Sequence, residues 1–97
     1  MLIDAADKSG EPVWRLPVWD DYKEYIRSEW ADMKNSGGRW GGAVTAAVFL
    51  KQFVECPSWA HVDIAGTAYT ESENARDPRG ATGSGVRMAV RFLESLG

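Results

Sequence analysis

The stretch Trp59–Gly66 reads Trp-Ala-His-Val-Asp-Ile-Ala-Gly, and it contains the best strand candidate of this 97-residue chain. Its apolar residues Ala60, Val62 and Ile64 alternate with polar or aromatic ones over Trp59–Ala65, and a glycine ends the run. Alternation of this kind is typical of a half-buried strand. The earlier stretch Gly-Gly-Arg-Trp-Gly-Gly-Ala-Val-Thr-Ala-Ala combines the glycines of a sharp turn with the small residues of a helix start. The two stretches thus predict a helix that starts after a glycine turn and a strand that follows it.

Four segments have helical patterns. They are Met1–Lys8, Val18–Arg27, Gly42–Glu55 and the residues after Gly85 up to Ser95. Glycine follows the first segment, as it commonly follows a helix end, and Pro17 is well placed for the first turn of the second. In the third segment a broad apolar face indicates burial on more than one side, whereas the fourth has one apolar face opposite a charged one.

The remaining segments complete the expected architecture. Glu11–Leu16 is predicted to be an extended approach, Trp30–Asn35 a short strand and Thr70–Gly80 an exposed polar loop. Helices that alternate with short strands indicate an α/β class. We expect a partial three-layer α/β/α unit with a few short strands and three to four helices. Residues 1–97 would then form a single domain or a fragment of one.

Composition limits what the chain is able to do alone. A chain of 97 residues buries a modest fraction of its unfolded surface, so its stability is expected to be marginal. It nevertheless carries five Trp, three Tyr and three Phe residues, and each aromatic side chain can bury roughly 150–250 Å². We therefore expect part of this apolar surface to meet a partner.

Charge and hydropathy argue against two classes of partner. The net charge of −3 comes without a cationic stripe, so no nucleic-acid binding is expected. No apolar run approaches the ~20 residues that cross a bilayer, and no membrane association is expected. The single Cys56 forms no internal disulfide, which agrees with a reducing compartment and a cytoplasmic location. It is interpreted as a structural or exposed thiol.

His61 and Asp63 are candidates for chemistry, because residues two apart on a strand point to the same face. Such a pair can ligate a metal or act as a base and its orienting partner. A catalytic zinc takes three protein ligands, and this chain has one His and no matching cluster. The favoured interpretation is structural, with both side chains hydrogen-bonded to neighbouring backbone.

Two further features each have a functional and a structural interpretation. Gly80–Gly85 before a helix resembles a phosphate-binding turn, but the charged residues before it are no buried strand, which favours a tight turn and helix entry. Lys34 and Arg39 flank a glycine turn, where a buried cation can bind a carboxylate. Solvated loop charges explain these two residues equally well.

The chain resembles the leucine aminopeptidase (cytosol aminopeptidase) family, specifically the C-terminal segment of its catalytic domain. Six stretches carry the resemblance in one order. They are Glu11–Pro17, Ala31–Asn35, Gly37–Arg39, Gly42–Ala47, Trp59–Gly66 and Gly80–Gly83. The resemblance implies a homohexameric enzyme that removes N-terminal residues from peptides with two divalent cations, zinc or manganese. Two adjacent metals lower the pKa of a bridging water and polarise the scissile carbonyl.

The family's metal ligands belong to an Asn-Thr-Asp-Ala-Glu-Gly-Arg segment and to Lys and Asp residues before it. None of these strings occurs in residues 1–97. The resemblance therefore implies no catalytic residue, no metal ligand and no cofactor in this chain, and Lys34 and Arg39 do not inherit the roles of the family's active-site lysine and arginine.

The resemblance does carry over part of a substrate pocket. Ala65 and Ala68 match two positions that line the pocket for the N-terminal side chain of the peptide, and small residues there suit leucine-like substrates. Trp40 departs from the small residue or Tyr that is usual in the family after Gly-Gly-Arg, and a changed local contact is expected there.

Two hypotheses of function follow. The first is the C-terminal segment of a leucyl aminopeptidase, which forms fold and part of the pocket and is inactive alone. The alternative is a stand-alone, non-catalytic interaction module that kept this fold and binds a full-length enzyme or itself.

Overall fold

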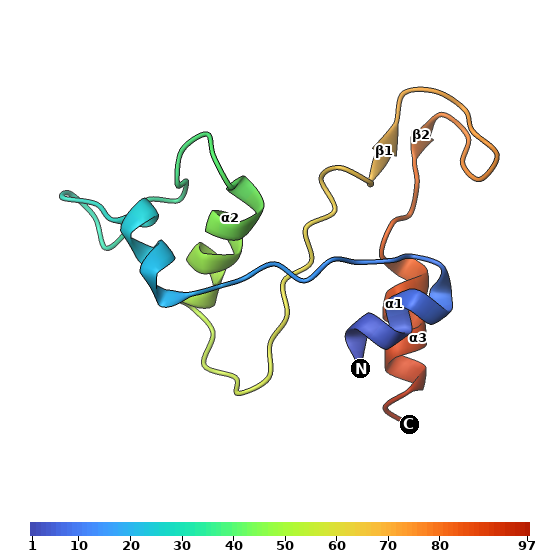
Figure 1. The fold of residues 1–97 in the computed structure, drawn as a ribbon, viewed down its shortest axis with the longest axis horizontal. Helices are drawn as coiled ribbons and strands as arrows, with labels where there is room; N and C mark the ends of the chain where they lie inside the picture. Colours follow the sequence, from blue (N-terminus) through green and yellow to red (C-terminus); the bar gives the residue numbers. More distant parts are fainter. The chain divides into compact units, whose positions relative to one another are not determined.

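The computed structural model describes Met1–Gly97, and these residues form two units. One unit combines Met1–Trp14 with Asp63–Gly97, and the other consists of Arg15–Val62. Figure 1 shows helices α1 and α3 and strands β1 and β2 in the first unit, with helix α2 in the second.

The first unit is built on a pair of helices, α1 (Leu2–Ser9) and α3 (Val86–Glu94), that pack against each other. Their small interface buries Ala5, Ala6 and Met88. Both helices were predicted, and their bounds lie within one residue of the expected ones. Gly10 ends α1 in the left-handed region at φ 71°, and the next amide donates a 3.0 Å hydrogen bond to the Ala6 carbonyl, a common helix termination.

A two-stranded antiparallel sheet completes this unit. Strand β1 (Tyr69–Thr70) pairs with β2 (Gly80–Ala81), with Tyr69 opposite Ala81 and Thr70 opposite Gly80. The polar loop between the strands was predicted, and its side chains order it locally. Asn74 Oδ1 accepts hydrogen bonds from the amides of Arg76 and Asp77 at 2.9 and 3.0 Å.

The second unit packs a short 3₁₀ helix, η1 (Asp20–Ile26), against α2 (Gly42–Lys51). Buried Ile26, Ala47 and Val48 supply its core. The helix predicted over Val18–Arg27 is observed as the shorter η1, which is a 3₁₀ helix and not an α-helix. Ion pairs between residues three apart, Asp20–Lys23 at 3.3 Å and Glu24–Arg27 at 3.7 Å, match the three-residue repeat of a 3₁₀ helix.

Helix α2 ends four residues before the predicted Glu55. The amides of Gln52 and Phe53 bond to carbonyls three residues back, and the Gln52 side chain donates to the Val48 carbonyl at 2.8 Å. These contacts tighten the last turn and take up carbonyls that a longer α-helix would use.

Two predicted strands are wrong. Between Trp30 and Asn35 the chain bends, because Ser28 Oγ accepts hydrogen bonds from the amides of Trp30 and Ala31 at 3.2 and 3.1 Å. The stretch Trp59–Ala65 contains no strand either, and no backbone hydrogen bond joins Trp59–Asp63 to another segment. Alternating side chains make a strand only where a neighbouring strand pairs with it.

The architecture is thus a partial α/β unit with four helices and one two-stranded sheet. The longest helix, α2, has ten residues, so no helix of this chain reaches from one side of a bilayer to the other.

Candidate functional site

The candidate site is the turn Ile64–Ala68, which leads directly into β1. The carbonyl of Ile64 accepts hydrogen bonds from the amides of Thr67 and Ala68 at 3.0 and 2.8 Å, and these bonds close the turn. Asp63 Oδ1 accepts a 2.9 Å hydrogen bond from the Ala65 amide at the start of the turn. The structural interpretation of Asp63 is therefore supported, since its carboxylate organises backbone.

The two alanines expected to line a substrate pocket both lie on this turn. Ala65 is exposed and Ala68 is half-buried. Neither side chain has a polar atom, so neither can donate or accept a hydrogen bond.

The glycine-rich segment that follows β2 runs beside the turn and into α3. Gly83 and Gly85 adopt positive φ angles of 69° and 91°, and Gly85 precedes the first residue of α3. Glycine takes such angles without the steric cost that a side chain would add. The favoured interpretation, a tight turn and helix entry, matches this geometry.

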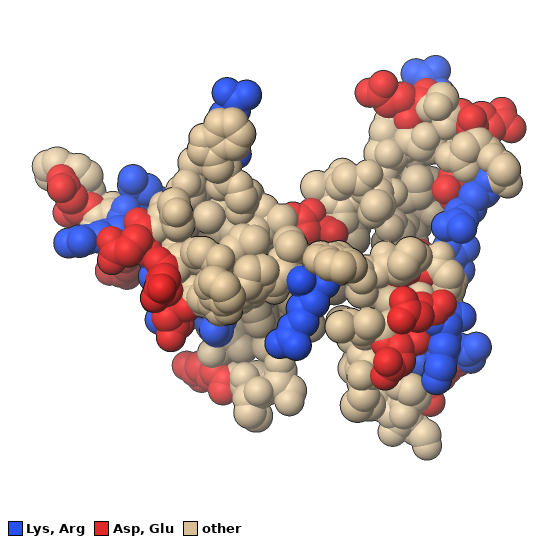
Figure 2. Space-filling view, viewed as in Figure 1, with Lys and Arg blue, Asp and Glu red and all other residues tan.

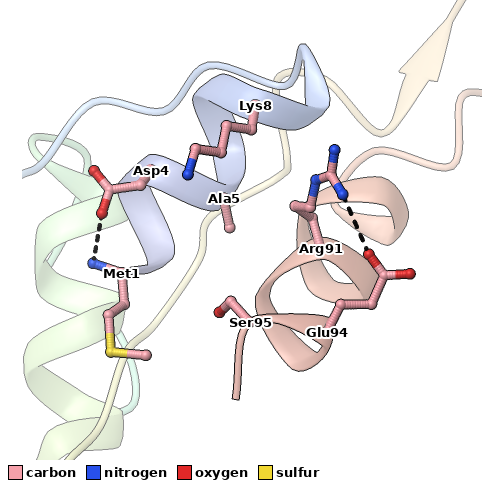
Figure 3. Close-up of a pocket in the computed structure, with 7 residues that line it drawn as sticks. All are labelled: Met1, Asp4, Ala5, Lys8, Arg91, Glu94 and Ser95. Atoms are coloured by element: carbon pink, nitrogen blue, oxygen red, sulfur yellow. Dashed lines mark hydrogen bonds and ion pairs between the residues drawn. The ribbon is translucent and has the colours of Figure 1, made fainter. Parts of the chain in front are cut away.

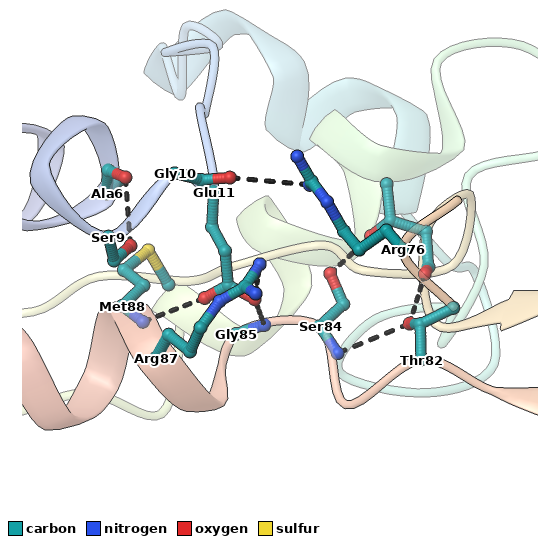
Figure 4. A network of polar contacts seen from close by, with 11 residues as sticks. Ala6, Ser9, Gly10, Glu11, Arg76, Thr82, Ser84, Gly85, Arg87 and Met88 are labelled. Carbon is teal, nitrogen blue, oxygen red and sulfur yellow. Dashed lines mark hydrogen bonds and ion pairs between the residues drawn. The ribbon is translucent and has the colours of Figure 1, made fainter. Parts of the chain in front are cut away.

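An internal carboxylate occupies the start of α3, where a phosphate would bind. Glu11 Oε1 accepts a hydrogen bond from the Gly85 amide at 3.1 Å, and Oε2 accepts one from the Met88 amide at 2.7 Å (Figure 4). The guanidinium of Arg87 lies 3.7 Å from Oε1, and the Glu11 side chain is only 12% exposed. The amides and the positive end of the helix are therefore already matched to an anion.

This environment changes the acidity of the carboxyl group. The Met88 amide, and with smaller effects the Gly85 amide and the charges of Arg87 and Arg76, hold the pKa of Glu11 below its usual value. Burial acts in the opposite direction and is outweighed. Glu11 was not among the predicted site residues, since nothing near it in the sequence indicates a partner so far along the chain.

Three hydroxyl groups join the candidate turn to the glycine-rich segment. We call Thr67, Thr82 and Ser84 the hydroxyl cluster. Thr82 Oγ1 donates to the Thr67 carbonyl at 2.5 Å, and it accepts a hydrogen bond from the Ser84 amide at 3.3 Å (Figure 4). The Thr67 and Ser84 hydroxyl oxygens lie 2.8 Å apart, within hydrogen-bond distance. The sequence showed the glycines of this segment but did not single out its hydroxyls.

His61 lies outside this turn, on a segment that pairs with no strand. Its ring stacks on Trp59 with centroids 6.3 Å apart, and it is half-buried. The idea that His61 and Asp63 share a strand face is wrong, because the strand is absent. Cys56 is an exposed free thiol, as one interpretation of the sequence expected, and its Sγ lies 3.0 Å from the Ser58 carbonyl oxygen.

Lys34 and Arg39 have exposed side chains. The Arg39 guanidinium lies over the ring of Trp40, 4.9 Å from its centroid, which is a cation–π contact at the surface. Lys34 borders an open hollow of about 540 Å³ in the second unit. The hollow is lined by Ser28, Ala31, Asp32, Met33, Lys34, Asn35, Phe49 and Phe53. Solvated loop charges describe both cations.

A second open hollow, of about 600 Å³, lies between α1 and α3 (Figure 3). It is lined by Met1, Asp4, Ala5, Lys8, Arg91, Glu94 and Ser95. The Met1 ammonium pairs with Asp4 at 3.1 Å, and Arg91 pairs with Glu94 at 3.5 Å, so these charges neutralise one another at the surface. Acidic and basic residues are likewise intermixed on the face shown in Figure 2.

No three His, Cys, Asp or Glu side chains lie close enough together to hold a metal ion. The donors present thus do not fit the paired cations that the family resemblance implies.

Comparison with known proteins agrees with the sequence motifs. The chain is 55% identical over 94 residues to the probable cytosol aminopeptidase of Syntrophotalea carbinolica, which covers 96% of this chain and 19% of that protein. It also resembles the solved structure of the bottromycin maturation enzyme BotP in complex with Mn, with 37% identity and a TM-score of 0.90 over 98% of this chain and 21% of that one. The cytosol aminopeptidase of Coxiella burnetii gives 39% identity and a TM-score of 0.82 over 97% of this chain and 21% of that one.

The chain therefore spans about a fifth of the length of the relatives that it matches. The sequence model of the cytosol aminopeptidase family, catalytic domain, matches residues 1–90. The resemblance carried by the six stretches is confirmed, and the chain belongs to the cytosol aminopeptidase family as part of its catalytic domain.

Proposed function

We propose that residues 1–97 are the C-terminal segment of a two-metal leucyl aminopeptidase that removes N-terminal residues from peptides. The observation that carries the proposal is the family match over residues 1–90. In the complete enzyme this segment contributes fold and one wall of the substrate pocket, while the ligands of two zinc or manganese ions come from the rest of the catalytic domain.

The wall is formed by Ala65 and Ala68. Both lie on one hydrogen-bonded turn. Methyl groups at these two positions are small enough to leave room for an apolar side chain such as leucine. A larger residue at either position would reduce that room.

The same proposal covers the architecture and the assembly. The two-stranded sheet and four helices form one part of a three-layer α/β/α domain, and the complete enzyme assembles as a homo-oligomer in the cytoplasm. Many large apolar side chains of this chain are exposed, among them Trp14 at 88% and Trp30 at 95%, which fits surfaces that the rest of such an assembly covers.

Two assays test the proposal. The purified chain, incubated with leucine p-nitroanilide and Mn²⁺ or Zn²⁺, is expected to show no turnover. A chimera in which residues 1–97 replace the matching segment of the Syntrophotalea carbinolica relative is expected to hydrolyse this substrate when loaded with metal. A folded, metal-loaded chimera without activity would overturn the proposal.

Substitution of Ala68 tests the proposed pocket wall directly. In the chimera, Ala68→Phe is expected to raise KM for leucine p-nitroanilide about tenfold or more by filling the pocket. Ala75→Phe, on the exposed loop between the strands, is the matched control and is expected to leave KM unchanged.

The alternative is a stand-alone interaction module that binds a full-length enzyme or a second copy. Exposure of Trp30 and Trp40 (95% and 78%) favours a surface of this kind. A monodisperse oligomer in analytical ultracentrifugation would support the module. A monomer, or an aggregate, would support the segment of a larger enzyme.

A further inference from the structure

We infer that Thr82 is a positioning residue for the substrate pocket, and that it acts by holding Ala68 in place. The inference rests on the proposed function, in which Ala68 forms part of the wall. It assigns a role in side-chain selection to the glycine-rich segment before α3.

Thr82 is bonded to both peptide groups that flank Ala68. Its hydroxyl donates to the carbonyl of Thr67, which belongs to the peptide bond before Ala68. Its amide donates at 3.0 Å to the carbonyl of Ala68, which belongs to the peptide bond after it. One residue thereby fixes the orientation of both peptide planes at the wall.

The rest of the hydroxyl cluster strengthens this hold. The Ser84 amide donates to Thr82 Oγ1, so that the Thr82 hydroxyl acts as donor and acceptor at once. The hydroxyls of Thr67 and Ser84 join the same two segments a second time. Hydrogen bonds connected in this way orient one another.

Ordered segments lie on both sides of Thr82 in the sequence. It directly follows β2, which is paired with β1, and it lies three residues before Gly85, whose amide is bound by Glu11. A wall supported by ordered elements keeps its position better than a free loop does. A displacement of about 1 Å at such a wall changes how well a leucine side chain is accommodated.

The first experiment measures this hold in the chain itself. Amide hydrogen exchange is followed for Ala68, whose N–H donates to Ile64 inside the turn. Thr82→Val keeps the shape and the amide but removes the hydroxyl, and with it both the bond to the Thr67 carbonyl and the acceptor for the Ser84 amide. Loss of the bond to Thr67, which is the one that reaches the turn, is expected to accelerate exchange at Ala68 about fivefold. Thr82→Ser, which restores the hydroxyl, is expected to return exchange to near the unsubstituted rate.

The matched control is Thr70→Val, because the Thr70 hydroxyl donates to the Ser72 carbonyl and takes no part in the hydroxyl cluster. Unchanged exchange at Ala68 in Thr82→Val, or an equal effect of Thr70→Val, would overturn the inference.

The second experiment reads out substrate selection in the chimera described above. The ratio of kcat/KM for leucine p-nitroanilide to that for alanine p-nitroanilide is expected to fall about fivefold in Thr82→Val, mainly through KM for the leucine substrate, and to recover in Thr82→Ser. An equal loss for both substrates would indicate a general effect on folding and would overturn the inference.

The two experiments also separate the inference from the proposed function. An inactive unsubstituted chimera would contradict the proposed function, whereas the exchange measurement would still decide whether Thr82 holds the turn.

Discussion

Glu11 Oε2 lies 2.7 Å from the backbone nitrogen of Met88, although the two residues are 77 positions apart. Through this contact the segment that leaves α1 is bound to the start of α3. Met88 is also one of the buried residues between these helices, so the carboxylate and the apolar interface stabilise the same pairing.

Glu11→Gln is expected to destabilise the first unit by about 1–2 kcal/mol, because it removes the charge that interacts with the helix start and with Arg87. Native-state amide exchange in α3 measures the change. Glu94→Gln on the same helix is the control, since its carboxylate is 61% exposed and paired only with Arg91. An effect of Glu94→Gln as large as that of Glu11→Gln would contradict the prediction.

Stability of the first unit is also expected to depend on pH in the acid range. The pKa of Glu11 is lowered in the folded chain, so its contribution is complete above the ordinary glutamate pKa of about 4.3. The contribution is lost as pH falls below that value and through the folded-state pKa. Amide exchange in α3, converted to opening free energies at each pH, is expected to show this loss in the unsubstituted chain and a smaller one in Glu11→Gln.

Any residue with a side chain is expected to be destabilising at position 37, because its Cβ would clash with Thr45. The backbone angles of Gly37 are not the reason. A Cβ added there would lie 2.5 Å from Thr45 Cγ2, and Thr45 is buried in α2. We expect Gly37→Ala to destabilise the second unit by about 1–3 kcal/mol through overpacking. Gly42→Ala, where a Cβ meets nothing within 4 Å, is the control and is expected to leave amide exchange in α2 unchanged or slower. Equal acceleration in both variants would refute the steric explanation.

Exposed and buried apolar residues of the second unit are expected to respond very differently to truncation. Trp30 is 95% exposed, so Trp30→Ala should change the free energy of unfolding by less than about 0.5 kcal/mol. Ile26 is 3% exposed, and Ile26→Ala should lower that free energy by about 2 kcal/mol or more. Urea unfolding followed by circular dichroism measures both. A large effect of Trp30→Ala would mean that its side chain is covered in solution.

Those elements of the fold that are set by residues close together in the sequence were predictable. Helices α1 and α3 were expected almost at their observed bounds, because Gly10 and the charged face of α3 are local signals. The loop between β1 and β2 was predicted from its polar composition. The strand expected over Trp59–Ala65 was wrong, since pairing depends on a partner segment that a local pattern does not reveal.

The candidate site was likewise predicted only in part. Family motifs drew attention to Ala65 and Ala68, and the structure places both on one turn. Glu11 and Thr82 were not foreseen, because their partners are brought near by folding and no spacing in the sequence marks them. The sequence favoured a tight turn and helix entry over a phosphate site for the glycine-rich segment, and the Glu11 carboxylate at the helix start agrees with that interpretation.

Cys56 carries the one thiol of the chain, and this thiol is exposed. A maleimide fluorophore would therefore attach at a single known position, which suits labelling for fluorescence anisotropy. Storage in air would join two chains through Cys56, so preparations for sizing experiments require a reducing agent.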